Sequence, residues 1–162
     1  MTDSRVTKLL TIHRGTSSQT DSRWIAIEES LGLRLPADYK VMVDLFGASS
    51  WDDFLHVLSP FDDGLNLQQR GQQILDADRE SRLAFPSHYP IALYPESGGL
   101  LPWAITDNGD TLYFITSGPP DEWPILIKGS RAPEFEVSFL PAPLLVHHAA
   151  IGTFQSTILA QS

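Results

Sequence analysis

The segment that most constrains the fold is residues 107–110, which read Asp-Asn-Gly-Asp and lie between two apolar runs. Asn-Gly is the dipeptide that most readily supplies the two positive φ angles of a two-residue hairpin loop. We therefore predict that residues 100–127 hold the central antiparallel strands of a sheet, with Asp107 opposite Asp110. This register sets three cross-strand pairs: Ile105 with Leu112 and Trp103 with Phe114 on one face, and Ala104 with Tyr113 on the other.

Apolar spacing predicts helices and further strands around this hairpin. Apolar residues recurring at i, i+3 and i+7 indicate helices, and strict alternation indicates strands. Gly32 and Gly47 follow the first two helices where a left-handed cap is needed, and Pro36 suits the start of the second. The predicted helices are residues 23–31, 37–46, 65–80 and 144–154, and the predicted outer strands are residues 54–58, 91–94, 123–127 and 135–139.

Consecutive strands joined by short turns indicate the α+β class. We expect an antiparallel sheet of about five to six strands with helices packed against it, and a mixed pairing at one edge stays open. The length of 162 residues suits one domain, which we assign to residues 23–162. Residues 1–22 are interpreted as a polar lead-in, with one weak helical turn around Val6, Leu9 and Leu10 and a flexible stretch over residues 15–20.

Composition excludes several classes of protein. The chain has no cysteine, which excludes disulfides and thiolate metal sites and suits a cytoplasmic location. Residues 1–10 are too polar for a signal peptide, and no apolar run of about 18 residues indicates a membrane span. The net charge of -9 disfavours direct binding of nucleic acid and favours basic protein partners. The alternative is that this charge only maintains solubility.

No residue pattern indicates catalysis or a cofactor. The chain lacks a Gly-x-Ser-x-Gly elbow, and the Gly-Gly pair at residues 98–99 precedes a strand, whereas a phosphate cradle precedes a helix. His147 and His148 are adjacent, so on a helix they point about 100° apart and do not suit one metal ion. Acid pairs lie in turns with Gly and Pro neighbours and are interpreted as solvated, so we expect no catalytic residue, cofactor or metal. These pairs are residues 52–53, 62–63, 107 with 110, and 121–122.

A protein-binding surface is the remaining hypothesis. Tryptophan anchors inside a charged rim carry binding energy efficiently, and Trp51 is followed by two acids and Phe54. Trp103 and Trp123 are instead predicted to lie in the core. The alternative for Trp51 is that it covers the second helix while the acids are only solvated. The hypothetical partner-binding residues are Trp51, Asp52, Asp53, Asp62, Asp63, Asp121 and Glu122.

Three local patterns occur in a fixed order along the chain. They are Leu-Gly at 31–32 followed by Leu-Pro-Ala-Asp-Tyr-Lys at 35–40, Leu-Pro-Trp-Ala at 101–104 followed by Asn-Gly-Asp at 108–110, and Asp-Glu-Trp-Pro-Ile at 121–125. Together they resemble the SUKH superfamily, whose members include a fungal cell-wall synthesis regulator and many bacterial immunity proteins. The positions matching the family pattern, most of them assigned to folding, are Leu35, Pro36, Tyr39, Gly47, Trp103, Gly109, Asp110 and Trp123.

The resemblance implies an α+β fold with helices against one antiparallel sheet, and it implies no catalysis. It further implies a cytoplasmic immunity protein that binds a cognate bacterial toxin, often a nuclease, and blocks its active site. The rival is a regulatory scaffold resembling the fungal members, which binds several cellular proteins. The glutamine-rich residues 66–73 and the tail beyond Pro141 match no family pattern, so their roles stay open.

Overall fold

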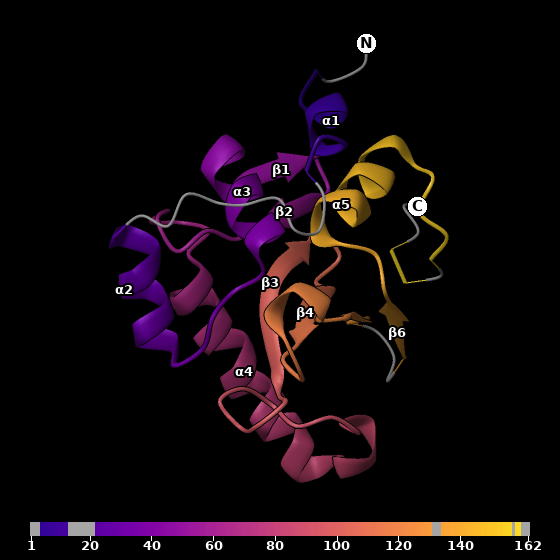
Figure 1. Cartoon of the computed structure of the whole chain (residues 1–162). Coiled ribbons are helices and arrows are strands. Elements are labelled where there is room, and N and C mark those ends of the chain that lie inside the picture. The colour runs from indigo at the N-terminus through magenta and orange to yellow at the C-terminus, as the bar shows by residue number, and fades with distance from the viewer. Residues whose placement is uncertain (1–3, 13–21, 131–133, 157, 160–162) are drawn as a thin grey trace.

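A six-stranded antiparallel sheet runs through the molecule, and each strand pairs with its neighbour in the sequence (Figure 1). The computed structural model describes residues 4–12, 22–130, 134–156 and 158–159. This arrangement confirms the α+β class, and every strand pairing is antiparallel, so the edge is not mixed. The strands are β1 (Ser49–Trp51), β2 (Leu55–Val57), β3 (Leu100–Thr106), β4 (Thr111–Ile115), β5 (Ile125–Lys128) and β6 (Phe135–Ser138).

Helices cover both faces of this sheet, and the four predicted helices are confirmed with shifted ends. The helix predicted from residue 65 begins at 67 and continues to 84, and the last helix spans 142–151. In Figure 1, α4 lies behind β3, with α3 and α5 toward the viewer. The helices are α1 (Ser4–Leu9), α2 (Ser22–Leu31), α3 (Ala37–Phe46), α4 (Leu67–Ala84) and α5 (Ala142–Ile151), with short 3-10 turns η1 (Pro86–His88) and η2 (Pro120–Glu122).

The sequence of α3 shows why the helix forms where it does. Pro36 has φ of -57° and ψ of 136°, which is an extended conformation that leads directly into the first helical turn. Gly47 has φ of +66°, a value that a side chain with a Cβ rarely adopts, and its N–H bonds to the Val43 carbonyl at 2.7 Å. Both ends are therefore fixed by single residues, and the apolar face between them packs on the sheet.

The main core lies between the sheet and helices α1, α2, α3 and α5, and Tyr39 of α3 is at its centre. The Tyr39 ring is fully buried and makes edge-on contacts with Trp24, Trp103 and Phe114. Its hydroxyl donates to the Leu58 carbonyl at 2.6 Å. Burial raises the pKa of this phenol well above its usual value, so the hydroxyl stays a donor.

A second, smaller core lies on the opposite face of the sheet, under α4. Leu75 of α4 packs there with Leu93, Leu100 and Leu126. The Asp78 carboxylate of α4 is buried in this layer and accepts hydrogen bonds from the Tyr113 hydroxyl at 2.7 Å and the Tyr89 hydroxyl at 3.2 Å. Burial, reinforced by the Asp78 charge, raises the pKa of Tyr113. The glutamine-rich start of α4 therefore belongs to a helix with a structural role.

The hairpin between β3 and β4 is confirmed, but its predicted register is wrong by one residue. Ile105 pairs with Thr111, and Ala104 pairs with Leu112. Within this turn only Gly109 has a positive φ, at +84°, and its N–H bonds to the Thr106 carbonyl at 3.0 Å. The loop thus has three residues and ends in a left-handed glycine, whereas the prediction assumed two left-handed positions.

A β-bulge between Pro102 and Ala104 shifts the β3–β4 register a second time. The inserted residue is Trp103, which stacks on Phe114 with ring centroids 5.1 Å apart. The prediction that these two rings share a face is confirmed. The predicted pair of Ala104 with Tyr113 is wrong, because the one-residue shift at the turn pairs Ala104 with Leu112 in the main core, while Tyr113 faces α4.

Two other strand assignments need correction. Residues 48–50 were expected to form a loop, because the small polar Ser49 and Ser50 gave no alternating apolar signal, yet residues 49–51 form β1. Residues 91–94 were expected to form a strand, yet the structure has a single bridge there, between Leu93 and Leu100. Prolines at positions 90 and 95 enclose this segment, and a proline cannot donate to a strand ladder.

Both ends of the described chain contribute to the main core. Val6, Leu9 and Ile12 are buried, and the Val6 carbonyl lies 2.8 Å from Nδ1 of the buried His147. Residues 4–12 are therefore part of the domain and not a lead-in, because α1 supplies an apolar face that packs on α5. The stretch predicted to be flexible, residues 15–20, lies outside the described residues.

Candidate functional site

The seven residues of the predicted partner-binding surface lie in separate parts of the molecule. Trp51 is fully buried, packs against Phe46 of α3 and lies under the Arg5 guanidinium, whose carbon is 4.4 Å from the ring centroid. Its indole N–H donates to the Ser49 hydroxyl at 2.8 Å. The hypothesis that Trp51 is an exposed anchor is therefore wrong. The alternative is correct: Trp51 covers the second predicted helix, residues 37–46, which is α3.

Asp121 of η2 supports the fold at the start of α3. Its carboxylate Oδ1 accepts the backbone N–H of Ala37 at 2.9 Å, which is one of the N–H groups that a helix leaves without an internal partner. The side chain therefore caps α3 from a segment 84 positions away in the sequence. Glu122 is exposed beside it. Neither residue lies on the turns that carry Asp52 and Asp53.

We expect Asp121→Ala to lower the free energy of unfolding by about 1 kcal/mol, because the α3 cap is lost. Glu122→Ala is the matched control, since it removes one exposed acid from the same turn and should change stability by less than about 0.5 kcal/mol. Urea unfolding followed by circular dichroism measures both values. Equal stability losses in the two variants would show that the Asp121 cap contributes nothing.

Asp62 and Asp63 lie in the turn that precedes α4. The Asp62 carboxylate accepts the backbone N–H groups of Gly64 at 3.0 Å and Leu65 at 2.7 Å, which is a local turn contact. Asp63 is exposed. Asp62 borders a small hollow of about 200 Å³ that is also lined by Arg23 and Asp44, so opposite charges are mixed there. This turn presents no purely acidic surface.

Asp52 and Asp53 form the β1–β2 turn, and the fold joins this turn to the β3–β4 hairpin. Both residues are exposed and have left-handed backbones, with φ of +54° and +49°. The carbonyl of the next residue, Phe54, accepts the backbone N–H of Asp107 at 3.1 Å. The two turns therefore lie side by side at one end of the sheet. We call the residues Asp52, Asp53, Phe54 and Asp107 the turn-end surface.

A line of side-chain hydrogen bonds fixes this surface. The Asp107 carboxylate lies 2.6 Å from Nε2 of His56, and Nδ1 of the same ring lies 2.8 Å from the Ser50 hydroxyl. A Ser–His–Asp line of this kind can be catalytic when a buried acid orients the ring. Here the Asp107 side chain is 59% exposed, and the ring presents its nitrogens in the order opposite to that of serine hydrolases. We interpret the line as a tie that links β1, β2 and the hairpin.

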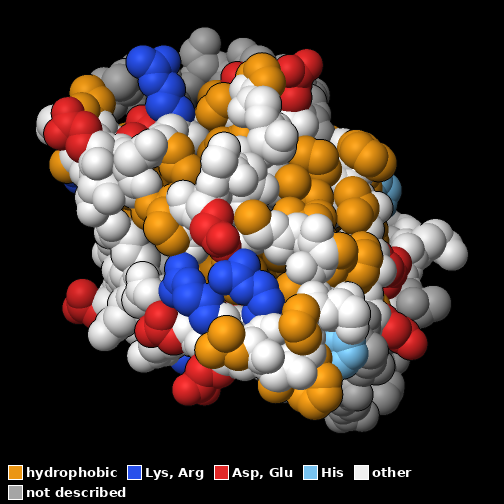
Figure 2. Space-filling view, turned by 90° about the horizontal axis from the view of Figure 1, so that it is seen from below, with side chains coloured by type: hydrophobic (Ala, Val, Ile, Leu, Met, Phe, Trp, Pro, Cys, Tyr) orange, Lys and Arg blue, Asp and Glu red, His pale blue; other side chains and the backbone are white. Residues whose placement is uncertain are grey.

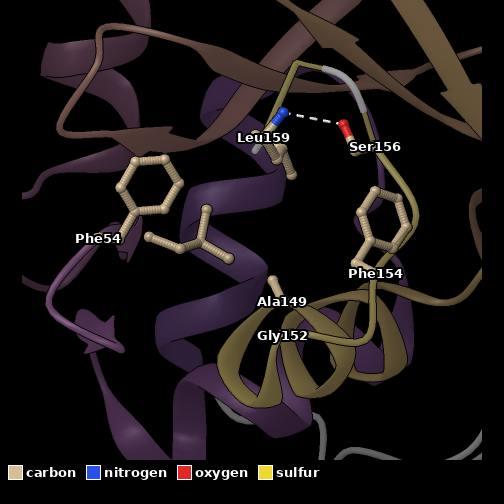
Figure 3. Close-up of a pocket in the computed structure, with 7 residues that line it drawn as sticks. Phe54, Ala149, Gly152, Phe154, Ser156 and Leu159 are labelled. Carbon is tan, nitrogen blue, oxygen red and sulfur yellow. Dashed lines mark hydrogen bonds between the residues drawn. The ribbon is translucent and has the colours of Figure 1, made fainter. Parts of the chain in front are cut away.

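A pocket of about 330 Å³, lined mostly by residues with apolar side chains, opens beside the turn-end surface (Figure 3). Phe54 and Phe154 lie on opposite sides of it, and Ala149 of α5 lies below. The tail after α5 closes the third side, where the Leu159 N–H donates to the Ser156 hydroxyl at 2.9 Å. The complete lining is Phe54, Leu55, Ala149, Gly152, Phe154, Ser156 and Leu159.

Phe54 belongs both to the turn-end surface and to the lining of the pocket, so the two features form one continuous site. A hollow for one apolar side chain beside several carboxylates is the composition of a protein-binding surface. Sequence reasoning missed Asp107, which it treated as the partner of Asp110. The structure separates them: Asp110 is buried and accepts hydrogen bonds from the Thr106 hydroxyl at 2.9 Å and the Ser130 N–H at 3.2 Å.

A wider hollow of about 610 Å³ between α2 and α3 has a structural explanation. One carboxylate oxygen of Glu28 accepts the Leu35 N–H at 2.7 Å and the Lys40 ammonium at 3.2 Å. The two charged side chains are only 11% and 12% exposed. Glu28 and Lys40 therefore hold the connection between the two helices, which makes them poor candidates for contacting a partner.

The positions that match the SUKH pattern have structural roles: they are either buried or glycines with a positive φ angle. Gly47 and Gly109 have positive φ angles at the ends of α3 and the hairpin loop. The remaining six are all buried: Leu35, Pro36, Tyr39, Trp103, Asp110 and Trp123. The core positions predicted for Trp103 and Trp123 are confirmed.

Comparison of the chain with protein-family models, curated proteins and solved structures found no match. Within the described residues, no helix has both the length and the apolar character needed to cross a bilayer. The same residues contain no cluster of three or more His, Asp or Glu side chains that is arranged to hold a metal ion. His147 and His148 make separate contacts, to the Val6 carbonyl and to the Thr153 hydroxyl.

Proposed function

We propose that this chain is a non-enzymatic immunity protein of the cytoplasm that binds a cognate bacterial toxin, of the nuclease type, and occludes its active site. The observation that supports this proposal is that the turn-end surface adjoins a pocket lined mostly by apolar side chains, at one end of the sheet. The ordered resemblance to the SUKH superfamily supports the same function. No cofactor takes part in it.

The electrostatics of the site support a basic partner. A nuclease active site must attract phosphates and is therefore positively charged. The turn-end surface presents the carboxylates of Asp52, Asp53 and Asp107 on a chain of net charge -9. Opposite fields of this kind raise the rate of association and fix the orientation of the partners. The pocket between Phe54 and Phe154 would receive one apolar side chain of the toxin, which would slow dissociation.

The test is co-expression with toxin domains encoded beside this gene, scored by survival and by complex formation. We expect the double variant Asp52→Asn with Asp53→Asn to slow association about tenfold at low ionic strength and to weaken its salt dependence. Asparagine is chosen because it tolerates the left-handed backbone of this turn. Stopped-flow measurement over a series of salt concentrations gives both quantities.

Two further variants separate the parts of the proposal. Asp63→Asn with Glu80→Gln removes the same number of negative charges outside the turn-end surface, and it should change association much less. Ala149→Phe fills the pocket and should raise the dissociation rate about tenfold while the association rate is kept. Equal slowing by both charge variants would remove the turn-end surface from the interface. Several weak partners without rescue of growth would instead support the regulatory scaffold.

A further inference from the structure

The chain contains two asparagines, and the structure holds their side-chain amides differently. Asn66 precedes α4, where its amide oxygen accepts the Gln69 N–H at 2.9 Å. Its amide nitrogen donates to the carbonyls of Pro60 at 3.2 Å and Asp62 at 2.9 Å. Asn108 lies at the tip of the β3–β4 loop and is exposed, and within the described residues no hydrogen bond holds its side chain. The Asn108 amide can therefore rotate toward its own backbone, whereas the Asn66 amide is fixed.

The residue after Asn108 is glycine, so the next backbone nitrogen is not shielded by a side chain. Gly109 is exposed, and its N–H donates to the Thr106 carbonyl at 3.0 Å, a bond that must open before the nitrogen can react. Loop tips with few backbone hydrogen bonds open at little cost in free energy. The base of the loop stays closed, because the Thr106 N–H donates to the Asp110 carbonyl at 3.0 Å and the Thr106 hydroxyl to its carboxylate at 2.9 Å. The tip can therefore open while the sheet stays paired.

The Ser130 hydroxyl contacts the peptide group that joins Asn108 to Gly109. It donates to the Asn108 carbonyl oxygen at 2.6 Å. When the Gly109 nitrogen of this peptide group loses its proton, the negative charge is delocalised onto that oxygen. A hydrogen bond to a charged oxygen is roughly twice as strong as one to a neutral oxygen, so the Ser130 hydroxyl stabilises the anion more than the neutral peptide. The fold therefore places a nucleophile, a rotatable amide and a stabilising donor in one loop.

We propose that Asn108 is a site of spontaneous deamidation, in which the Gly109 nitrogen is the nucleophile and the Ser130 hydroxyl stabilises its anion. A solvent base removes the Gly109 amide proton, and the nitrogen forms a bond to Cγ of Asn108. The bond from Cγ to Nδ2 breaks, Nδ2 takes a proton from water and leaves as ammonia, and a five-membered succinimide ring remains. Water then opens the ring at either carbonyl, which gives aspartate or isoaspartate. The net reaction consumes one water, releases one ammonia and leaves a carboxyl group at position 108.

The new carboxylate extends the turn-end surface, and this consequence rests on the function proposed above. Asn108 directly follows Asp107, and the β3 arrow in Figure 1 points toward α5, so the loop lies at that end of the molecule. Figure 2 views the molecule from below, away from this loop, and there hydrophobic side chains gather between separate charged groups. Deamidation adds one negative charge to the net charge of -9, at the end where the acids of the turn-end surface already lie together. It should therefore strengthen the attraction of a basic partner.

Mass spectrometry of the aged full-length chain tests the chemistry without any partner. After incubation at mildly alkaline pH, tryptic digestion separates the two asparagines. Peptide 83–128 contains Asn108 as its only side-chain amide, and peptide 41–70, with Asn66 and two glutamines, is the internal control. We expect peptide 83–128 to gain one dalton at least about tenfold faster than peptide 41–70, because only the hairpin loop opens easily. No gain in peptide 83–128, or equal gains in both peptides, would overturn the proposal.

The products and one variant test the roles of Gly109 and Ser130. Attack by the Gly109 nitrogen gives isoaspartate as well as aspartate, which have equal mass and separate by chromatography, so aspartate alone would refute this nucleophile. Ser130→Ala should slow the reaction about threefold, because the anion loses a charge-assisted hydrogen bond. Ser130→Thr should restore the rate, and Ser97→Ala, at an exposed position before β3, is the matched control. Faster deamidation of Ser130→Ala would show that Ser130 only holds the loop closed.

Two variants of Asn108 test the consequence for binding, with the toxin domain encoded beside this gene as the partner in stopped-flow measurements. Asn108→Asp carries the charge of the product and should associate about threefold faster at low ionic strength. Asn108→Gln keeps a neutral amide and should associate at the rate of the unmodified chain. Deamidation of peptide 83–128 with an unchanged association rate for Asn108→Asp would refute only the effect on the turn-end surface. If the toxin domain does not bind the unmodified chain, the proposed function fails, and the peptide masses still decide the chemistry.

Discussion

Replacing Tyr39 by alanine is expected to lower the free energy of unfolding by about 3–5 kcal/mol, the largest effect of any side-chain truncation considered for this protein. The ring is fully buried between Trp24, Trp103 and Phe114, so its removal leaves a cavity that three rigid aromatic neighbours cannot fill. For a domain of this size, the melting temperature should fall by roughly 10 °C. Differential scanning calorimetry measures both quantities.

Tyr39→Phe isolates the contribution of the hydroxyl group. This variant keeps the ring and leaves the buried Leu58 carbonyl without the donor that now lies 2.6 Å away. An unsatisfied buried acceptor costs about 1–3 kcal/mol, so the phenylalanine variant should lie between the unmodified chain and the alanine variant. If the phenylalanine variant matched the unmodified chain, the hydrogen bond to the Leu58 carbonyl would be irrelevant to stability. If the alanine variant were as stable as the unmodified chain, Tyr39 would not be the centre of the main core.

Gly99→Ala is expected to destabilise the protein by about 3 kcal/mol or more, because the added methyl group meets backbone atoms. A Cβ at this position would lie 2.5 Å from both the Leu93 carbonyl carbon and the Tyr94 nitrogen, and 2.8 Å from the Glu96 oxygen. The neighbouring loop has little freedom to move, since the Glu96 carboxylate accepts the Leu93 N–H at 3.0 Å and an Arg82 N–H at 2.7 Å.

Gly64→Ala is the matched control for Gly99→Ala. Gly64 also lies in a turn, but a Cβ there meets only an Asp62 carboxylate oxygen at 3.7 Å, and its φ is ordinary. This substitution should change stability by less than about 0.5 kcal/mol, and it slightly restricts the unfolded chain. Thermal unfolding of the two variants side by side gives the comparison. A Gly99→Ala protein as stable as Gly64→Ala would show that the loop over residues 93–96 moves freely.

Local signals in the sequence predicted the elements whose causes are themselves local. The ends of α3 are determined by Pro36 and Gly47, and both were predicted correctly. The predicted hairpin register was wrong by one residue. Asn-Gly is compatible with turns that have either one or two left-handed residues, and here only Gly109 is left-handed. The bulge at Trp103 was also missed, since it depends on how the indole ring packs against Phe114.

The candidate site could be predicted only in part, because its components come from distant segments. Asp52 and Asp53 were expected to be exposed acids, and they are. Their neighbour Asp107 comes to the same end only through the pairing of Leu55 with Thr106, which no local pattern reveals. The burial of Trp51 follows from β1, a strand that had no periodic signal. The far wall of the pocket comes from the C-terminal tail, beyond the recognisable motifs.

The order of the strands has a consequence for how such a protein can diversify. Within the described part of the chain, every strand of the sheet pairs only with strands adjacent to it in the sequence. A longer or shorter turn between two strands therefore leaves the remaining registers intact, so each turn is a separate place for insertions. Recognition can change at residues 52–54 and 107–109 over many generations, while the aromatic interior beneath them stays the same.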